Sequence, residues 1–66
     1  MNVTVNGNIR TIAAGTRLAE LLDGERIPAR GTAAAVDAEV VPRSTWSDFV
    51  LHEGQAVELL TAVQGG

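Results

Sequence analysis

Apolar and polar residues alternate at the start of the chain, which begins Met-Asn-Val-Thr-Val-Asn. A period of two places Val3 and Val5 on the same face of a half-buried strand. Asn6 and Gly7 follow, and because both residues tolerate a positive φ, this pair is typical of a tight hairpin turn. We therefore expect a strand that returns from the turn over residues 8–13.

The spacing of apolar residues then changes to three and four at Leu18, Leu21 and Leu22. This pattern lays one leucine stripe along a short helix, which Gly24 is expected to end. Thr16 is the expected N-cap, because its hydroxyl can accept a hydrogen bond from a free backbone N–H at the start of the helix. With that cap no acid stands at the third helical position, so we expect an incomplete capping box.

Small residues at positions 33–36 predict a third strand, and residues 39–41 predict a short fourth strand. A tight turn is needed between these two strands. Asp37 and Ala38 occupy the turn without the glycine that a type I′ turn prefers. Because an alanine forced to positive φ costs about 1 to 2 kcal/mol, we expect a turn of another type here.

The last strand is expected over residues 56–63, where Val57 and Leu59 share the buried face. The opposite face carries Glu58, Leu60 and Ala62. Pairing of the first and last strands in parallel would place them together inside one mixed sheet. The sequence thus predicts an α+β fold of two layers, in which a single helix covers one face of a mixed sheet.

Other local patterns give structural predictions and no catalytic site. Residues 43–46 indicate a single helical or 3₁₀ turn, and the only tryptophan, Trp46, is expected to cover an open end of the core. His52 has no partner at the spacing of metal ligands, so no metal site is predicted. The acidic residues show no spacing that argues for acid–base catalysis.

The composition limits the classes of function further. A chain of 66 residues forms one small domain that buries about 60% of the surface of its unfolded chain, so an internal catalytic cavity and an enzyme are not expected. The absence of cysteine excludes disulfides, thiolate nucleophiles and cysteine-rich metal sites. The core is therefore expected to hold by packing alone.

The net charge and the hydropathy limit the expected partners and cellular location of the protein. The formal net charge is -3, from eight acids and five arginines, and nucleic acid is a poor partner because phosphate binding requires a basic surface. The sequence shows no charged and apolar leader pattern, and no apolar run approaches the ~20 residues that cross a bilayer, so we expect a chain that is soluble and unexported. We expect a protein of the cytoplasm without membrane contact.

Several motifs together resemble one known family over nearly the whole chain. The most discriminating stretch is Val-Pro-Arg at residues 41–43, followed by Trp46. The other matching positions are Asn6, Ala14, Gly15, Thr16, Glu20, Leu21, Leu22, Gly54, Gly65 and Gly66. On these residues the chain resembles the ThiS family, the sulfur carrier proteins of thiamine (thiazole) biosynthesis, which have the ubiquitin-like β-grasp fold. It departs from the family at Asp37-Ala38, where Asn-Gly is common.

The resemblance implies a protein cosubstrate that other enzymes act on. In the family an adenylating enzyme, ThiF, uses ATP and magnesium to activate the terminal carboxylate, and a sulfur donor system then converts it to a thiocarboxylate. Thiazole synthase, ThiG, takes the sulfur from there. On this chain the sulfur-carrying residue is Gly66, while Gly65 and Gln64 are expected to enter the partner's active site. The resemblance implies no cofactor bound by this chain itself.

The residue types at the end of the chain suit this role. Glycine has no Cβ, so Gly65 and Gly66 can pass a narrow channel and present an unhindered carbonyl carbon. We expect one domain over residues 1–63 and a flexible tail over residues 64–66. The alternative is an ordinary frayed terminus, in which the two glycines have no role.

Two further alternatives remain open from the sequence. Ubiquitin-like proteins use an apolar patch on the open sheet face, so Leu60, with Glu58 and Ala62, is predicted to dock partner enzymes; the alternative is a single exposed leucine without a role. The resemblance also extends to MoaD, the small subunit of molybdopterin synthase, and a carrier for another pathway or a plain interaction module is a further possibility. The region before the terminal glycines lacks the prolines that MoaD proteins tend to have there, which favours the thiazole carrier.

Overall fold

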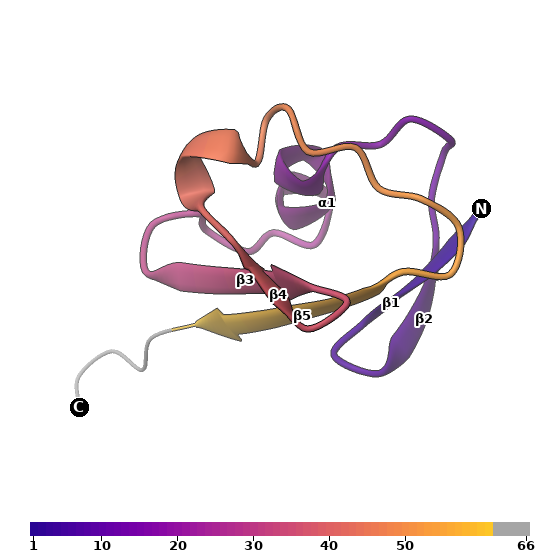
Figure 1. The fold of residues 1–66 in the computed structure, drawn as a ribbon, viewed down its shortest axis with the longest axis horizontal. Coiled ribbons are helices and arrows are strands. Elements are labelled where there is room, and N and C mark those ends of the chain that lie inside the picture. Colours follow the sequence, from indigo (N-terminus) through magenta and orange to yellow (C-terminus); the bar gives the residue numbers. More distant parts are fainter. Residues whose placement is uncertain (62–66) are drawn as a thin grey trace.

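A mixed five-stranded sheet with one helix packed on it forms the fold of residues 1–61, the part of the chain that the computed structural model describes (Figure 1). The elements follow one another as β1 (Asn2–Val5), β2 (Asn8–Thr11), α1 (Leu18–Gly24), β3 (Thr32–Val36), β4 (Glu39–Val41), the 3₁₀ helix η1 (Arg43–Thr45) and β5 (Ala56–Thr61). The strands lie in the order β2-β1-β5-β3-β4. β1 and β5 are parallel neighbours, which confirms the predicted pairing and the α+β fold.

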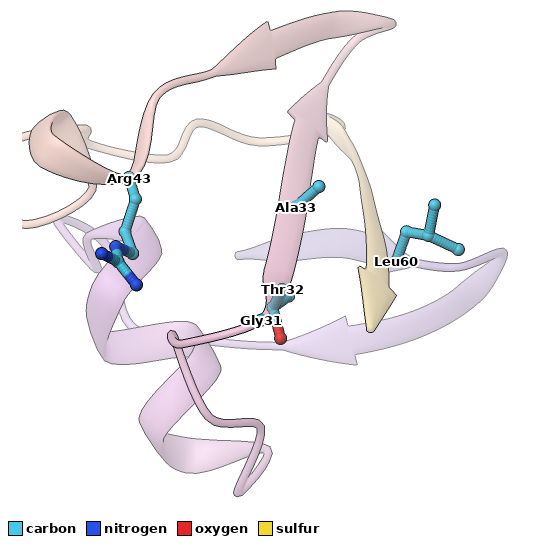
Figure 2. A pocket seen from close by; sticks show the side chains of 5 residues that line it. All are labelled: Gly31, Thr32, Ala33, Arg43 and Leu60. Atoms are coloured by element: carbon cyan, nitrogen blue, oxygen red, sulfur yellow. The ribbon is translucent and has the colours of Figure 1, made fainter. Parts of the chain in front are cut away.

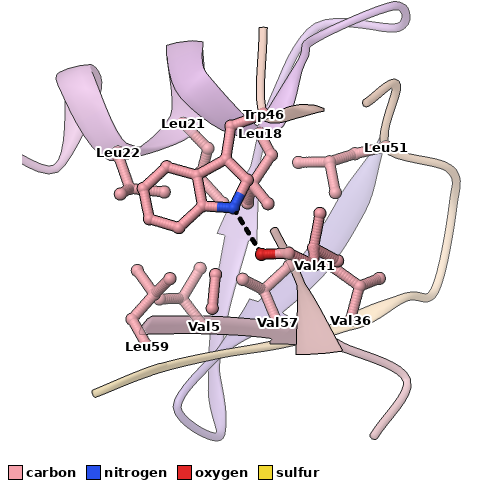
Figure 3. Packing of buried hydrophobic residues seen from close by; sticks show 11 residues of the cluster. Val5, Leu18, Leu21, Leu22, Val36, Val41, Trp46, Leu51, Val57 and Leu59 are labelled. Atoms are coloured by element: carbon pink, nitrogen blue, oxygen red, sulfur yellow. Dashed lines mark hydrogen bonds between the residues drawn. The ribbon is translucent and has the colours of Figure 1, made fainter. Parts of the chain in front are cut away.

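The face of the sheet under α1 forms the hydrophobic core (Figure 3). The predicted leucine stripe of α1 is buried, since Leu18, Leu21 and Leu22 are 0%, 4% and 2% exposed. These side chains pack against inward-facing residues of the sheet, which are Val5, Ala34, Val36, Val41, Val57 and Leu59. The alternation of buried and exposed positions in the strands therefore decides which face α1 covers.

The indole of Trp46 closes the core beside the end of β4, as predicted. Trp46 follows η1, is buried, and its Nε1–H donates a hydrogen bond to the backbone oxygen of Val41 at 2.8 Å (Figure 3). Thr45 supports the same turn, because its N–H and its hydroxyl both donate to the oxygen of Pro42. The position of η1 relative to the sheet is thus fixed by packing and by hydrogen bonds.

The start of α1 differs from the prediction. Arg17 and not Thr16 is the N-cap, because Arg17 lies in an extended conformation bridged to Val50 and the helix begins only at Leu18. The shift makes Glu20 the third helical residue, and its carboxylate accepts the N–H of Arg17 at 2.8 Å. The expectation that no acid stands at this position is therefore wrong. The hydroxyl of Thr16 donates instead to the oxygen of Ala13.

The turn between β3 and β4 is of type I′, so the prediction of another turn type is wrong. Asp37 and Ala38 have φ of 50° and 69°, so both lie in the left-handed region that a type I′ turn requires. The turn is tied to β5 through Asp37, whose N–H donates to the oxygen of Ala56 and whose carboxylate accepts the N–H of Ala56. These two bonds help hold the alanine in a conformation that its side chain disfavours.

Candidate functional site

β5 lies in the middle of the sheet and carries the chain toward its C-terminal residues. Its last described residue, Thr61, is opposite Thr32 at the start of β3. β5 pairs with β1 on one side and with β3 on the other, so both edges of this strand are hydrogen-bonded within the sheet. Four residues predicted to act in sulfur transfer or docking lie outside the described residues, namely Ala62, Gln64, Gly65 and Gly66.

The two faces of β5 have different environments, as the alternation in its sequence predicts. Val57 and Leu59 point into the core and are 0% and 8% exposed, whereas Leu60 is 76% exposed. Glu58 is exposed on the same face as Leu60. Leu60 and Glu58 therefore lie together on the sheet face opposite α1, which we call the open face.

A shallow hollow of about 400 Å³ lies on the open face next to Leu60. The register places Ala33 opposite Leu60, and Ala35 opposite both Glu58 and Val40. Because the methyl groups of the two alanines are short, the larger side chains on either side of them enclose a depression. From the sequence, these small residues predicted only a strand, although their position between bulkier neighbours is the signal for the hollow.

A second hollow, of about 410 Å³, lies at the start of β3 and is lined by Gly31, Thr32, Ala33, Arg43 and Leu60 (Figure 2). Figure 2 shows the Arg43 and Leu60 side chains on opposite sides of β3. We call this depression the Arg43–Leu60 hollow. It adjoins Thr61, because Thr61 pairs with Thr32 in the wall of the hollow. No local pattern in the sequence connects Arg43 with Leu60.

The described part of the chain has neither a metal-binding cluster nor a membrane-spanning helix. Among residues 1–61, no three histidine, aspartate or glutamate side chains gather where they could bind a metal ion. No helix in this range is both long and apolar enough to cross a membrane.

Two comparisons with known proteins, one against family models and one against curated proteins, identify the same family. A family model described as the ThiS family matches residues 3–66, a range that includes the terminal glycines. Among curated proteins, the sulfur carrier protein ThiS of Escherichia coli (strain K12) is 29% identical over 66 residues, and the match covers 100% of each chain. The matched region thus extends past β5 into the residues that the structure does not describe.

Solved structures agree with this result. The crystal structure of a thiamine biosynthesis protein (ThiS) from Geobacter metallireducens is similar to this chain with a TM-score of 0.85 and 32% identity, over 100% of both chains. An NMR solution structure of a thiamine biosynthesis protein from the same organism gives a TM-score of 0.82 at 32% identity, over 100% of this chain and 88% of the other. The whole fold of this chain therefore has counterparts among solved structures of thiamine biosynthesis proteins.

Proposed function

The chain belongs to the ThiS family, the sulfur carrier proteins of thiamine biosynthesis, and we propose that the main-chain carboxylate of Gly66 is the group that carries its sulfur. The observation that supports this assignment is the family match, which continues through Gly65 and Gly66. The names of the relatives favour thiamine biosynthesis over molybdopterin synthase, whose small subunit was the alternative from sequence.

The chemistry accounts for the need for partner enzymes. A carboxylate is a weak electrophile with a poor leaving group, so it does not accept sulfide directly. In the proposed first step an oxygen of the Gly66 carboxylate attacks the α-phosphorus of ATP, and pyrophosphate leaves. A hydrosulfide-level sulfur donor then attacks the acyl carbon, AMP leaves, and a proton is released as the thiocarboxylate forms. ATP and magnesium belong to the activating partner and not to this chain.

The distance from the sheet to the reacting group suits this role. Residues 62–66 follow Thr61 and, fully extended, span at most about 17 Å at ~3.4 Å per residue. That length lets the terminal carboxylate reach a partner's active site while the folded body stays outside. Gln64 and Gly65 would then lie in the entry channel, where the absence of a Cβ on Gly65 reduces the width required.

The partners follow from this chemistry. We propose a ThiF-like adenylating enzyme, a sulfur donor system and a ThiG-like thiazole synthase, all acting in the cytoplasm. The part of the open face at the end of β5 is the proposed docking surface, with Leu60 as its apolar centre and Glu58 beside it; Ala62 is assigned to the same surface from its place in the sequence. The exposure of Leu60 supports this proposal, because an exposed leucine next to a hollow offers apolar area for a partner to bury.

Intact-protein mass spectrometry tests the function directly. The protein is incubated with ATP, magnesium, a ThiF-like enzyme and a sulfur donor, and the expected product has one oxygen replaced by sulfur. Deletion of Gly66 should abolish this product, since the carboxylate is then one residue short. Gly66→Ala keeps the length and the carboxylate but adds a methyl group next to the acyl carbon, so it should react more slowly. The absence of any mass change with the wild-type chain would contradict the proposal.

A further inference from the structure

Arg43 is exposed at one wall of the Arg43–Leu60 hollow and makes no ion pair with the rest of residues 1–61. The ion pair found in this range joins Arg10 to Glu25, with Nε and Oε2 separated by 3.0 Å. Within residues 1–61, the guanidinium of Arg43 therefore has no carboxylate partner. On a chain with a net charge of -3, it is a local positive site beside an apolar surface.

The backbone of Arg43 is held in place, although its side chain forms no ion pair within the described part of the chain. Arg43 is the first residue of η1, and its oxygen accepts the N–H of Trp46, whose indole is buried in the core. Pro42 precedes it in an extended conformation and accepts two hydrogen bonds from Thr45. The rigid turn thus presents the guanidinium to the hollow with little loss of backbone freedom on binding.

The other walls of the hollow are apolar and lie next to the end of β5. Leu60 is 76% exposed, and Ala33 lies directly opposite it in the sheet. Thr61 pairs with Thr32 in the adjoining wall, so a protein that receives residues 62–66 passes close to this hollow. Any ligand here meets an apolar surface on one side and a positive charge on the other.

From this arrangement we propose that the Arg43–Leu60 hollow binds a segment of the activating enzyme in which an apolar side chain lies beside a carboxylate. The inference rests on the proposed function, since it concerns the partner that takes the end of this chain. The planar guanidinium of Arg43 matches a carboxylate through two parallel hydrogen bonds, while Leu60 and Ala33 bury the apolar side chain.

The contact with the guanidinium of Arg43 fixes the orientation of the partner, which a contact with Leu60 alone does not. A partner held only at Leu60 can rotate about that contact, whereas a charged contact across β3 fixes its orientation. The orientation decides whether the residues after Thr61 point toward the partner's active site. Arg43 is thus a specificity-determining residue on the binding surface and takes no part in the chemistry.

Steady-state adenylation kinetics with a ThiF-like enzyme test this inference. Arg43→Glu should lower kcat/KM about tenfold and Arg43→Gln about threefold at low salt, through KM and with little change in kcat. The effect should shrink as salt is added, because exposed charges are screened. The matched control is Arg17→Glu, which makes the same charge change at the exposed N-cap of α1, on the other layer of the fold. It should leave kcat/KM unchanged.

The outcomes separate this inference from the proposed function. Efficient adenylation of Arg43→Glu, equal to that of Arg17→Glu, would overturn the inference and leave the sulfur carrier function standing. An equal loss in the two variants would also overturn it, because the effect would then come from net charge. Failure of the wild-type chain to be adenylated would contradict the proposed function itself. Arg43→Gln keeps the test valid if the charge reversal lowers stability, and thermal unfolding of each variant checks this.

Discussion

The side-chain amide of Asn6 binds both backbone polar groups of Leu59. Its Nδ2 donates to the oxygen of Leu59 at 3.2 Å, and its Oδ1 accepts the N–H of Leu59 at 2.8 Å. β1 ends at Val5, so the amide takes the place of the peptide group that a longer strand would supply. On the side of β5 that faces β1, the hairpin turn therefore extends the hydrogen bonding as far as Leu59.

Asn6→Gly tests this contact without breaking the turn. Glycine accepts the φ of 50° found at this position, so the change removes mainly the two hydrogen bonds to Leu59. We expect a loss of about 1 to 3 kcal/mol in the free energy of unfolding, because two polar groups lose their partner. Urea denaturation measures the loss, and hydrogen exchange should show a faster amide at Leu59.

A matched control for Asn6→Gly lies at the other end of β5. Asp37→Gly removes the hydrogen bond that the carboxylate of Asp37 accepts from the N–H of Ala56, also from a turn residue with φ of 50°. Its effect on exchange should be at Ala56 and not at Leu59. An unchanged exchange rate at Leu59 in Asn6→Gly would show that the amide does not hold this strand.

Ala38→Gly should stabilise the protein. Ala38 has a φ of 69°, and the left-handed conformation costs an alanine about 1 to 2 kcal/mol. Glycine removes that cost and adds about 0.5 to 1 kcal/mol of backbone entropy to the unfolded chain, which leaves a net gain of about 0.8 kcal/mol at the midpoints of the two ranges. The urea midpoint should rise. The same change at the strand residue Ala56, which has no positive φ, should lower it.

Trp46→Phe should destabilise the core by about 1 to 3 kcal/mol. The change removes the indole N–H that donates to the buried oxygen of Val41, which is then left without this donor. Unfolding of the variant in urea is measured by far-ultraviolet circular dichroism, because without the only tryptophan its fluorescence cannot report unfolding. Phe49→Leu, at a partly buried side chain with no polar atom, is the control and should cost less. Equal losses would mean that the hydrogen bond contributes little.

Leu60→Asp should impair docking and leave folding unchanged. Leu60 is 76% exposed, so the change affects little buried area, and thermal unfolding should match that of the wild type. Adenylation of Gly66 by a ThiF-like enzyme should slow about tenfold, because the partner would have to bury a charge on the open face. An unchanged adenylation rate would argue that Leu60 lies outside the contact.

Ile9→Asp is the control for Leu60→Asp. Ile9 is 69% exposed and pairs with Thr4, but it lies on β2, which is separated from β5 by β1. Its replacement therefore makes the same chemical change away from the end of β5. Adenylation should proceed at the wild-type rate, and an equal loss in both variants would extend the docking surface across the whole open face.

The sequence predicted the fold well where one residue pattern had one physical meaning. The alternation around Val3 and Val57 and the stripe from Leu18 to Leu22 each define a buried face, and those faces are the two sides of the core. The Asn-Gly turn was equally clear, since few residues adopt positive φ. The terminal glycines were identified by family resemblance, and their structure lies outside the described residues.

The errors arose where distant contacts override local preference. Thr16 is a favourable N-cap, but the bridge from Arg17 to Val50 moves the helix start by one residue. Ala38 disfavours positive φ, but the bonds of Asp37 to β5 help hold the turn. The hollow that contains Arg43 forms because η1 and β5 meet across β3, and no local pattern encodes that meeting.

The position of β5 in the sheet also bears on how the protein is made. This strand is synthesised after every other strand of residues 1–61, yet it joins β1 and β2 on one side to β3 and β4 on the other. A chain interrupted before Ala56 therefore lacks the strand that joins these two pairs into one sheet. Such a chain also lacks Gly66, so it has neither the complete folded body nor the carboxylate that we propose to carry the sulfur.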